Sequence, residues 1–249
     1  MAGHSKWASI KHKKKAVDAK RGALFTKLTR AITVAARDGG DPEGNPALAL
    51  AVQKARDASM PKDNIERAIA KGTGADSDAD AFESVLYEGY GPGGVAILVE
   101  ALTDNRNRTG SEVRHVFTKH GGNLGEPGSV AWTFEKKGEI VVDGSRYAED
   151  DLLAAIDAGA EDVALDGDVW EIVTGPTDVA AVRDALAAEG VEIESAELVQ
   201  RPTTQTPVDE GRVRTLMNLI EALEEHDDVQ AVHANFDVDA DVLERVAAA

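Results

Sequence analysis

Lysine and arginine gather at the start of this chain, where their spacing suits contact with a row of negative charges. Seven of them lie within the first 21 residues, namely Lys6, Lys11, Lys13, Lys14, Lys15, Lys20 and Arg21, and His12 lies among them. Lys27, Arg30 and Arg37 follow, and with Lys20 they can share one face of a helix. Such a row can follow a phosphate backbone, because each phosphate that it neutralises releases bound counterions. We therefore predict that these residues contact nucleic acid; for any one of them, a solvated surface charge is the alternative.

The distribution of charge along the chain supports this prediction. Residues 1–73 carry fifteen Lys/Arg and seven Asp/Glu, a net charge of +8, within a chain whose net charge is −18. The remaining residues carry twelve Lys/Arg and thirty-eight Asp/Glu, a net charge of −26. A polyanion is attracted to the first part and repelled by the second.

A second cationic segment, Thr103-Asp-Asn-Arg-Asn-Arg-Thr109, precedes a pattern that predicts a helix. Thr109-Gly-Ser-Glu112 has the spacing of a capping box. Arg106 and Arg108 would then lie just before a helix N-terminus, where amides and guanidinium groups can hold a phosphate together. The alternative is a capped loop whose arginines pair with neighbouring acids such as Asp104. The sequence leaves these two interpretations open.

The glycine pattern Gly89-x-Gly91-x-x-Gly94 formally matches the dinucleotide-binding fingerprint. In that fold the glycines must open a helix whose N-terminus meets the pyrophosphate. Here they precede the apolar run Val95 to Val99, which is typical of a strand. The pattern therefore favours a hairpin turn over a cofactor loop.

Neither the acidic residues nor the histidines show a metal-binding pattern. Asp237-x-Asp239-x-Asp241 resembles the start of a calcium loop, but Val242 and Ala248 occupy the positions where glycine and a bidentate glutamate are needed. The histidines lack the spacing of a helical metal motif. We expect no catalytic residue, no metal, no cofactor and no small-molecule substrate, and hence a protein that is not an enzyme.

Apolar periodicity divides the chain into helical and strand-rich parts. Helices are predicted over residues 20–37, 45–58 and 61–72, where Asn45-Pro46 has the form of a helix start. Residues 73–80 are rich in Gly, Asp and Ser and form a predicted hinge. Strands are expected at residues 85–87, 95–99 and 129–134, with a helix over residues 109–119.

Residues 138–200 predict six elements in the order βαββαβ, which is typical of a ferredoxin-like domain. This block holds seventeen acids and two bases, so it should face away from a polyanion. A helix at 208–225 and a strand at 229–236 supply the helix that the preceding block lacks. We therefore predict an α+β protein in which the ferredoxin-like domain is inserted into a discontinuous middle domain.

The predicted domains are 1–75, basic and helical; 80–137 plus 203–249, α+β; and 138–202, acidic and ferredoxin-like. A third small domain at the C-terminus is the alternative. Composition adds three expectations. The chain has no cysteine, which favours a reducing cytoplasm. No apolar run approaches the roughly 18 residues that span a bilayer, so no membrane contact is expected. We expect a monomer, and a lysine-rich segment 1–19 that is not ordered without its partner.

Several strings resemble the YebC/PmpR family over the whole chain, more weakly after about residue 138. They are Met1-Ala-Gly-His-Ser-Lys-Trp7, Ile10-Lys-His-Lys, Lys20-Arg-Gly, Phe25-Thr-Lys-Leu, Met60-Pro-Lys-Asp-Asn-Ile-Glu-Arg-Ala-Ile69, Tyr87-Glu-Gly-Tyr-Gly-Pro-Gly-Gly-Val95, Leu102-Thr-Asp-Asn-Arg-Asn-Arg-Thr109, Gly121-Gly-Asn-Leu-Gly125 and Gly128-Ser-Val130. The resemblance implies a three-domain α+β protein and a transcriptional regulator that binds DNA. Related proteins are also described as ribosome-associated translation factors that ease synthesis through proline-rich stretches. Family members often carry arginines where this chain has Ala47 and Ala49, so a phosphate contact from the second helix is not expected.

Two functions follow as hypotheses. A DNA-binding regulator should bind duplex DNA, with higher affinity at particular promoters. A translation factor should place its basic segment in a cavity lined by ribosomal RNA. The charge distribution favours the second modestly, because a body of net charge −26 weakens long-range attraction to an extended duplex.

Overall fold

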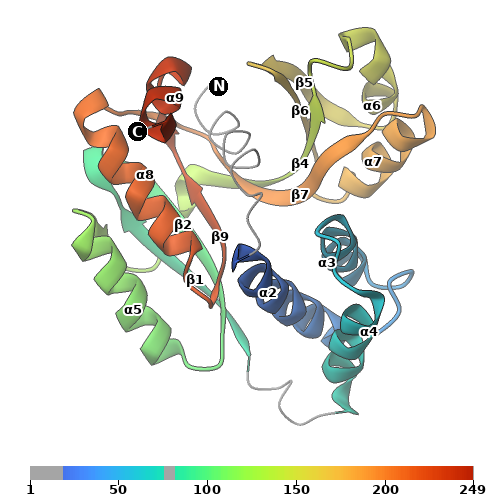
Figure 1. Ribbon diagram of the computed structural model, residues 1–249, viewed down its shortest axis with the longest axis horizontal. Coiled ribbons are helices and arrows are strands. Elements are labelled where there is room, and N and C mark those ends of the chain that lie inside the picture. The colour runs from blue at the N-terminus through green and yellow to red at the C-terminus, as the bar shows by residue number, and fades with distance from the viewer. Residues whose placement is uncertain (1–18, 76–81, 249) are drawn as a thin grey trace. The chain divides into compact units, whose positions relative to one another are not determined.

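The computed structural model describes residues 19–75 and 82–248 (Figure 1). Their contacts form two units, residues 19–75, 82–131 and 215–232 in the first and residues 132–214 and 233–248 in the second. Both units combine helices with a β-sheet, which confirms the predicted α+β class. Among the described residues no helix is long and apolar enough to cross a membrane. The division into three domains stays a prediction.

The first unit begins with three helices that share one apolar core. They are α2 (Ala19–Ala35), α3 (Pro46–Asp57) and α4 (Lys62–Ala70). Leu28 and Ile32 of α2 meet Leu48 of α3 and Ile65 of α4, and all four side chains are buried. The apolar residues that recur along the first predicted helix therefore lie on the face that α2 turns to its neighbours. A Cβ at Gly72 would collide with the carbonyl oxygen of Thr33, which shows how closely the chain after α4 approaches α2.

Asn45 joins the end of α2 to the start of α3. Its side-chain oxygen accepts a hydrogen bond from the Leu48 amide at 3.1 Å, and Pro46 occupies the first helical position, as the sequence predicts. Its amide nitrogen donates to the carbonyls of Ala35 at 2.7 Å and Gly39 at 2.9 Å. One buried side chain thus satisfies backbone groups at both ends of the connection.

The first unit continues as a four-stranded sheet with the order β3-β1-β2-β9. The strands are β1 (Glu83–Tyr90), β2 (Ala96–Thr103), β3 (Asn123–Leu124) and β9 (Val229–Ala234), and the helices that accompany them are α5 (Arg106–Lys119) and α8 (Glu210–Glu224). Residues 210–214 of α8 and 233–234 of β9 are assigned to the second unit. The ideal Cβ of Gly122 would lie 3.2 Å from Phe117 of α5 and 3.3 Å from Leu219 of α8, so the two helices meet beside this sheet (Figure 1).

The glycine pattern at 89–94 is a hairpin connection, as predicted. β1 pairs with β2 in an antiparallel register that places Gly89 opposite Ile97. Gly93 and Gly94 have φ values of 85° and 79°, which a residue with a side chain adopts only under strain. A Cβ on Gly89 would lie 2.7 Å from the Phe117 ring, so this glycine lets α5 pack closely on β1.

The predicted strand at 129–134 is wrong in all but its last residue. The buried carboxylate of Glu88 accepts hydrogen bonds from the amides of Gly128 at 2.6 Å and of Val130 and Ala131 at 2.7 Å. These amides therefore cannot take part in a β-ladder, and the chain forms a 3₁₀ turn at Ala131–Thr133.

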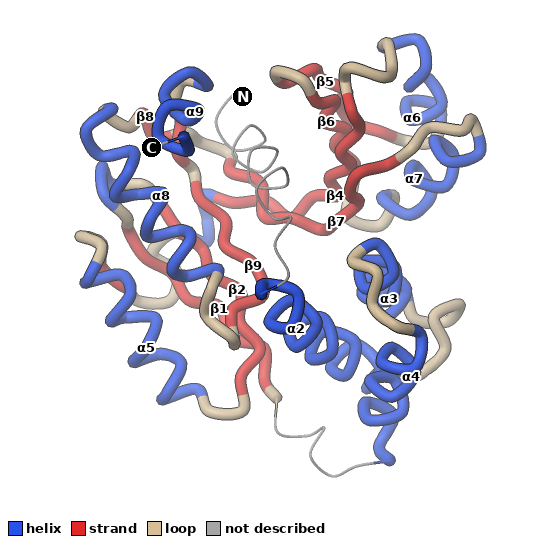
Figure 2. Tube along the Cα trace, viewed as in Figure 1, coloured by secondary structure: helices blue, strands red, loops and turns tan. Residues whose placement is uncertain are grey.

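The second unit contains the βαββαβ block that the sequence predicts. Its elements are β4 (Phe134–Asp143), α6 (Leu153–Asp157), β5 (Ala160–Asp166), β6 (Val169–Thr174), α7 (Val179–Ala188) and β7 (Ile193–Pro202). The strand order is β5-β6-β4-β7, so the first and third strands of the block lie at the centre (Figure 2). This arrangement is the ferredoxin-like order. Ile140 and Ile172 pair across the two central strands and are fully buried.

The C-terminal segment of the second unit holds elements that the sequence analysis missed. β8 (Thr206–Pro207) pairs in parallel with β10 (Phe236–Asp237), and α9 (Ala240–Ala248) follows. The Asp239 carbonyl accepts the amides of Val242 and Leu243, so the acidic repeat leads directly into this helix. Leu243 is fully buried and anchors α9.

Candidate nucleic-acid interface

Most of the predicted N-terminal cations lie outside the described residues. These are Lys6, Lys11, His12, Lys13, Lys14 and Lys15. Lys20 and Arg21 lie in the first turn of α2. Contact between this group and nucleic acid stays a prediction.

The predicted cations farther along bind the protein's own chain: Lys27 and Arg30 lie on α2, and Arg37 lies in the 3₁₀ turn Ala36–Asp38 that follows it. Lys27 Nζ donates to the Glu224 carbonyl at the end of α8, over 2.5 Å. Arg30 Nη1 donates to the Asp227 carbonyl at 2.7 Å and to Asp228 Oδ1 at 2.8 Å. Arg37 Nη1 donates to the Phe82 carbonyl at 2.7 Å. All three therefore hold α2 against neighbouring parts of the first unit.

Asp228 is the centre of this network. Its side chain is 4% exposed and also accepts hydrogen bonds from Arg108 Nη2 at 2.7 Å and Thr109 Oγ1 at 2.6 Å. Its carbonyl accepts the Leu102 amide at 2.8 Å, which fixes the residue beside β2. Asp228 thus joins α2 and α5 through its buried carboxylate and β2 through its backbone carbonyl.

The electrostatics of Asp228 follow from these contacts. Burial alone would raise its pKa, but the hydrogen bonds from Thr109 and Arg108 and the charges of Arg108 and Arg30 outweigh it. The pKa of Asp228 therefore lies below its ordinary value of 3.8. The group is an anion at neutral pH and balances the arginines around it.

The helix after the second cationic segment begins earlier than predicted. α5 starts at Arg106, and the Asn105 side chain accepts the Arg108 amide at 3.0 Å. The predicted capping box at Thr109 is therefore wrong, because the Thr109 hydroxyl donates to Asp228 and Asn105 provides the cap. Arg106 and Arg108 both lie inside the first helical turn.

The two arginines of this turn have different surroundings. Arg108 forms ion pairs with Asp104 at 2.9 Å and with Asp228 at 2.7 Å, so it follows the alternative in which neighbouring acids take the guanidinium group. Arg106 is exposed, and its carbonyl accepts the Tyr87 hydroxyl at 3.2 Å. A phosphate contact from this turn would fall mainly to Arg106.

Glu112, His226 and Asp228 lie close enough to hold a metal ion by distance alone, with ligand atoms within 4.8 Å of one another. Their donors and acceptors already serve hydrogen bonds. His226 Nδ1 accepts the Asp228 amide at 3.1 Å, and Nε2 lies 2.9 Å from Glu112 Oε2. Two arginines also contact the Asp228 carboxylate, and their charge opposes a cation there. The cluster is a hydrogen-bond network that orders the loop before β9.

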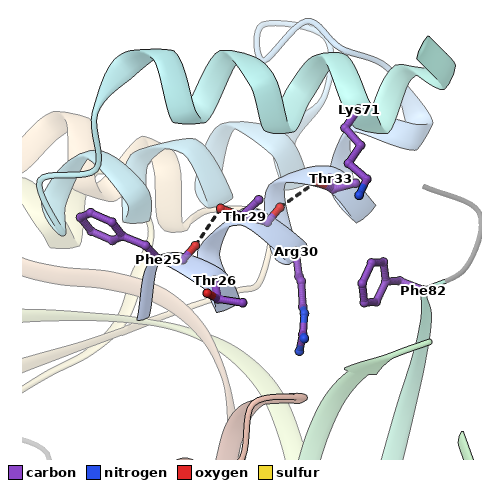
Figure 3. A pocket seen from close by; sticks show the side chains of 7 residues that line it. All are labelled: Phe25, Thr26, Thr29, Arg30, Thr33, Lys71 and Phe82. Carbon is purple, nitrogen blue, oxygen red and sulfur yellow. Dashed lines mark hydrogen bonds between the residues drawn. The ribbon is translucent and has the colours of Figure 1, made fainter. Parts of the chain in front are cut away.

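A groove of about 330 Å³ runs beside α2. It is lined by Phe25, Thr26, Thr29, Arg30, Thr33, Lys71 and Phe82 (Figure 3). The guanidinium carbon of Arg30 lies 5.4 Å from the centre of the Phe82 ring, within the range of a cation–π contact. Sequence reasoning found Arg30 but missed Phe25, Lys71 and Phe82, because no spacing in the sequence joins them.

The chain is similar to known proteins over nearly all its length. Residues 5–75 match "TACO1/YebC protein N-terminal domain", and residues 82–236 match "TACO1/YebC second and third domain". A protein of Rubrobacter xylanophilus named "Probable transcriptional regulatory protein" is 58% identical over 249 residues, covering 99% of this chain and 100% of that protein. A protein of Acidothermus cellulolyticus with the same name is 55% identical over 248 residues, covering 99% and 100%. The crystal structure of a conserved hypothetical protein from Aquifex aeolicus has a TM-score of 0.81 and 51% identity, covering 89% of this chain and 92% of that chain.

Proposed function

The chain belongs to the TACO1/YebC family, and on this premise we propose that it regulates gene expression by binding nucleic acid, as a binding protein and not an enzyme. The observation that carries the proposal is the separation of charge. Residues 1–73 have a net charge of +8 and the remainder has −26, so a polyanion is attracted to the first part and repelled by the second. The names of the relatives agree with a regulatory role.

The residues that we expect to contact nucleic acid are the cations among residues 1–21, up to the first turn of α2. Lys27, Arg30 and Arg37 donate to carbonyls or carboxylates of the same unit. Their role in the proposal is to fix the position of α2. Lys6, Lys11, His12, Lys13, Lys14, Lys15, Lys20 and Arg21 supply the phosphate contacts, with Arg106 as a second contact on α5.

A translation factor that binds ribosomal RNA is the second candidate. The contacts of Lys27, Arg30 and Arg37 favour it. Because these cations bind acceptors of the protein itself, they do not extend the basic segment into a long face that could follow a duplex. What remains is a short basic segment on an acidic body, which suits a local cavity lined by RNA better than an extended helix.

Crosslinking in cells tests both candidates, with sequencing of the DNA and of the RNA recovered with the protein. Reads concentrated at promoters would support a transcriptional regulator, and reads concentrated on ribosomal RNA would support a translation factor. The informative variant replaces Lys13, Lys14 and Lys15 by glutamine.

Its matched control replaces the exposed Lys62, Lys119 and Lys136 by glutamine, which removes the same charge elsewhere. Reads should fall in the first variant and persist in the control. Equal recovery from both variants would contradict the assignment of the basic segment. Recovery of neither DNA nor RNA with the unaltered protein would overturn the proposed function.

A further inference from the structure

The groove beside α2 combines two chemical surfaces that rarely share so small a space. Phe25 and Phe82 supply aromatic rings, and Arg30 and Lys71 supply positive charge (Figure 3). The threonines between them use their hydroxyl hydrogens within the helix, since Thr29 donates to the Phe25 carbonyl at 2.7 Å. Their oxygens stay available as acceptors. Aromatic rings, cations and acceptors together suit a ligand with a planar ring and an anionic group.

The two cations of the groove differ in what already balances them. Arg30 forms an ion pair with the buried Asp228 carboxylate at 2.8 Å. The Lys71 ammonium makes no hydrogen bond or ion pair with another residue in the described part of the chain. Lys71 belongs to the turn that follows α4, and Figure 3 shows its side chain on the Thr33 side of the groove. An anion entering the groove therefore meets Lys71 as the cation with unused donors.

The aromatic part of the groove is held in place. Arg30 is fixed by Asp228 and by the Asp227 carbonyl, and its guanidinium group lies against the Phe82 ring. A base that stacks on this pair gains contact with a ring and with a cation, and it loses little entropy in ordering them. Paired bases cannot reach such a surface, because their faces are covered within the duplex.

We propose that this groove binds one unpaired nucleotide of a single-stranded nucleic acid, with the base against Phe82 and Arg30 and a phosphate at Lys71. A volume of about 330 Å³ is near the lower limit of small-ligand sites, which suits one nucleotide. The inference rests on the proposed function and adds to it a second contact, specific for unpaired strands. The basic N-terminal segment supplies affinity for phosphates in general.

Fluorescence anisotropy with the full chain tests the inference. The probes are a labelled octamer of uridine, a DNA octamer of thymidine and a 16-base-pair DNA duplex. Phe82→Leu keeps an apolar side chain but removes the ring, and affinity for the octamers should fall about 5- to 150-fold. Phe82→Tyr keeps the ring and should retain the affinity of the unaltered protein.

Lys71→Gln removes the phosphate contact, and the salt dependence of octamer binding should decrease by about 0.7 in slope. Lys62→Gln is the matched control, because Lys62 is exposed on α4 and lies outside the groove. It should leave both affinity and slope unchanged. Duplex binding should be insensitive to all four substitutions.

The outcomes separate this inference from the proposed function. If the unaltered protein binds none of the probes, the proposed function fails and the inference falls with it. If it binds the octamers but Phe82→Leu and Lys71→Gln bind equally well, the groove is not the site and the proposed function stands. An equal loss for octamer and duplex would overturn the assignment to unpaired nucleotides. A peptide partner would also overturn it, if it bound the groove and the octamers did not compete.

Discussion

Asp228→Asn should loosen the first unit around its buried network. The carboxylate accepts hydrogen bonds from Arg30 on one oxygen and from Arg108 and Thr109 on the other. An asparagine of the same shape has one oxygen, so it can keep the Arg108 and Thr109 contacts but must lose the bond from Arg30. It also removes the charge that balances both guanidinium groups.

The magnitude follows from the exposure of the partners. A hydrogen bond to a charged group contributes about 1.5–3 kcal/mol. The side chains of Arg30 and Arg108 are 21% and 44% exposed, so water partly replaces the lost anion and screens the pair. We therefore expect a loss of about 2–3 kcal/mol, below the roughly 3–5 kcal/mol typical of breaking a fully buried pair.

Hydrogen exchange measured by mass spectrometry reports this loss locally. The Leu102 amide, which donates to the Asp228 carbonyl, and the amides of α5 should exchange about 30- to 150-fold faster. Asp104→Asn is the matched control, because Asp104 contacts the same Arg108 but is 47% exposed. It should cost less than about 1 kcal/mol. A loss in Asp228→Asn no larger than in this control would refute the reasoning.

The same comparison has a predicted pH dependence. Because the pKa of Asp228 is lowered in the folded protein, the folded state binds its proton less tightly than the unfolded chain. The advantage of the unaltered protein over Asp228→Asn should be complete well above pH 3.8 and should disappear as the pH falls through the lower folded value. An advantage that persists unchanged at pH 2 would contradict this assignment.

Three further predictions concern other parts of the chain. Glu88→Ala leaves three amides of residues 128–131 without their acceptor and should cost about 3–4 kcal/mol in urea unfolding, whereas Glu88→Gln, which keeps one oxygen, should cost about half as much. Burial and the charge of Glu171 raise the pKa of Glu139 to about 8, so ionisation of Glu139 destabilises the fold as the pH rises from about 4.5 to 8. As the pH rises across this window, the melting temperature of Glu139→Gln should therefore increase relative to that of the unaltered protein. A constant difference between the two melting temperatures would contradict the direction of the pKa shift. Deletion of residues 1–18, which removes five lysines and one aspartate and leaves α2 intact, should lower the salt slope of duplex DNA binding by about 0.9 for each lost phosphate contact; an unchanged slope would exclude this segment from the interface.

Local sequence signals located most of the fold. The Asn45-Pro46 start of α3, the apolar periodicity of α2 and the βαββαβ order of residues 138–200 each depend on residues a few positions apart. The wrong predictions lie where a carboxylate distant in the sequence accepts a hydrogen bond from a donor that the predicted local element would have used. Glu88 takes the amides of the predicted strand at 129–134, and Asp228 takes the Thr109 hydroxyl from the predicted capping box.

The candidate site shows the same limit. Charge alone identified the cations of α2 and of the turn after it, but it could not show that Lys27, Arg30 and Arg37 donate to the protein's own acceptors. The groove could not be predicted from the sequence either, because Phe25, Lys71 and Phe82 come together only when α2, the turn after α4 and the start of β1 pack.

By itself, the sequence determined the class of fold and the segregation of charge, since these depend on composition and on periodicity within single elements. Its specific residue strings indicated the family by resemblance. The tertiary structure decided which cations stay available for a ligand. Arg30 and Asp228 are 198 positions apart, and Arg108 and Asp228 are 120 apart. Contacts of that kind depend on how helices and strands pack, and local propensity does not encode them. A buried carboxylate must find cationic and hydroxyl donors wherever packing brings them, because an unpaired charge inside the protein is too costly to keep.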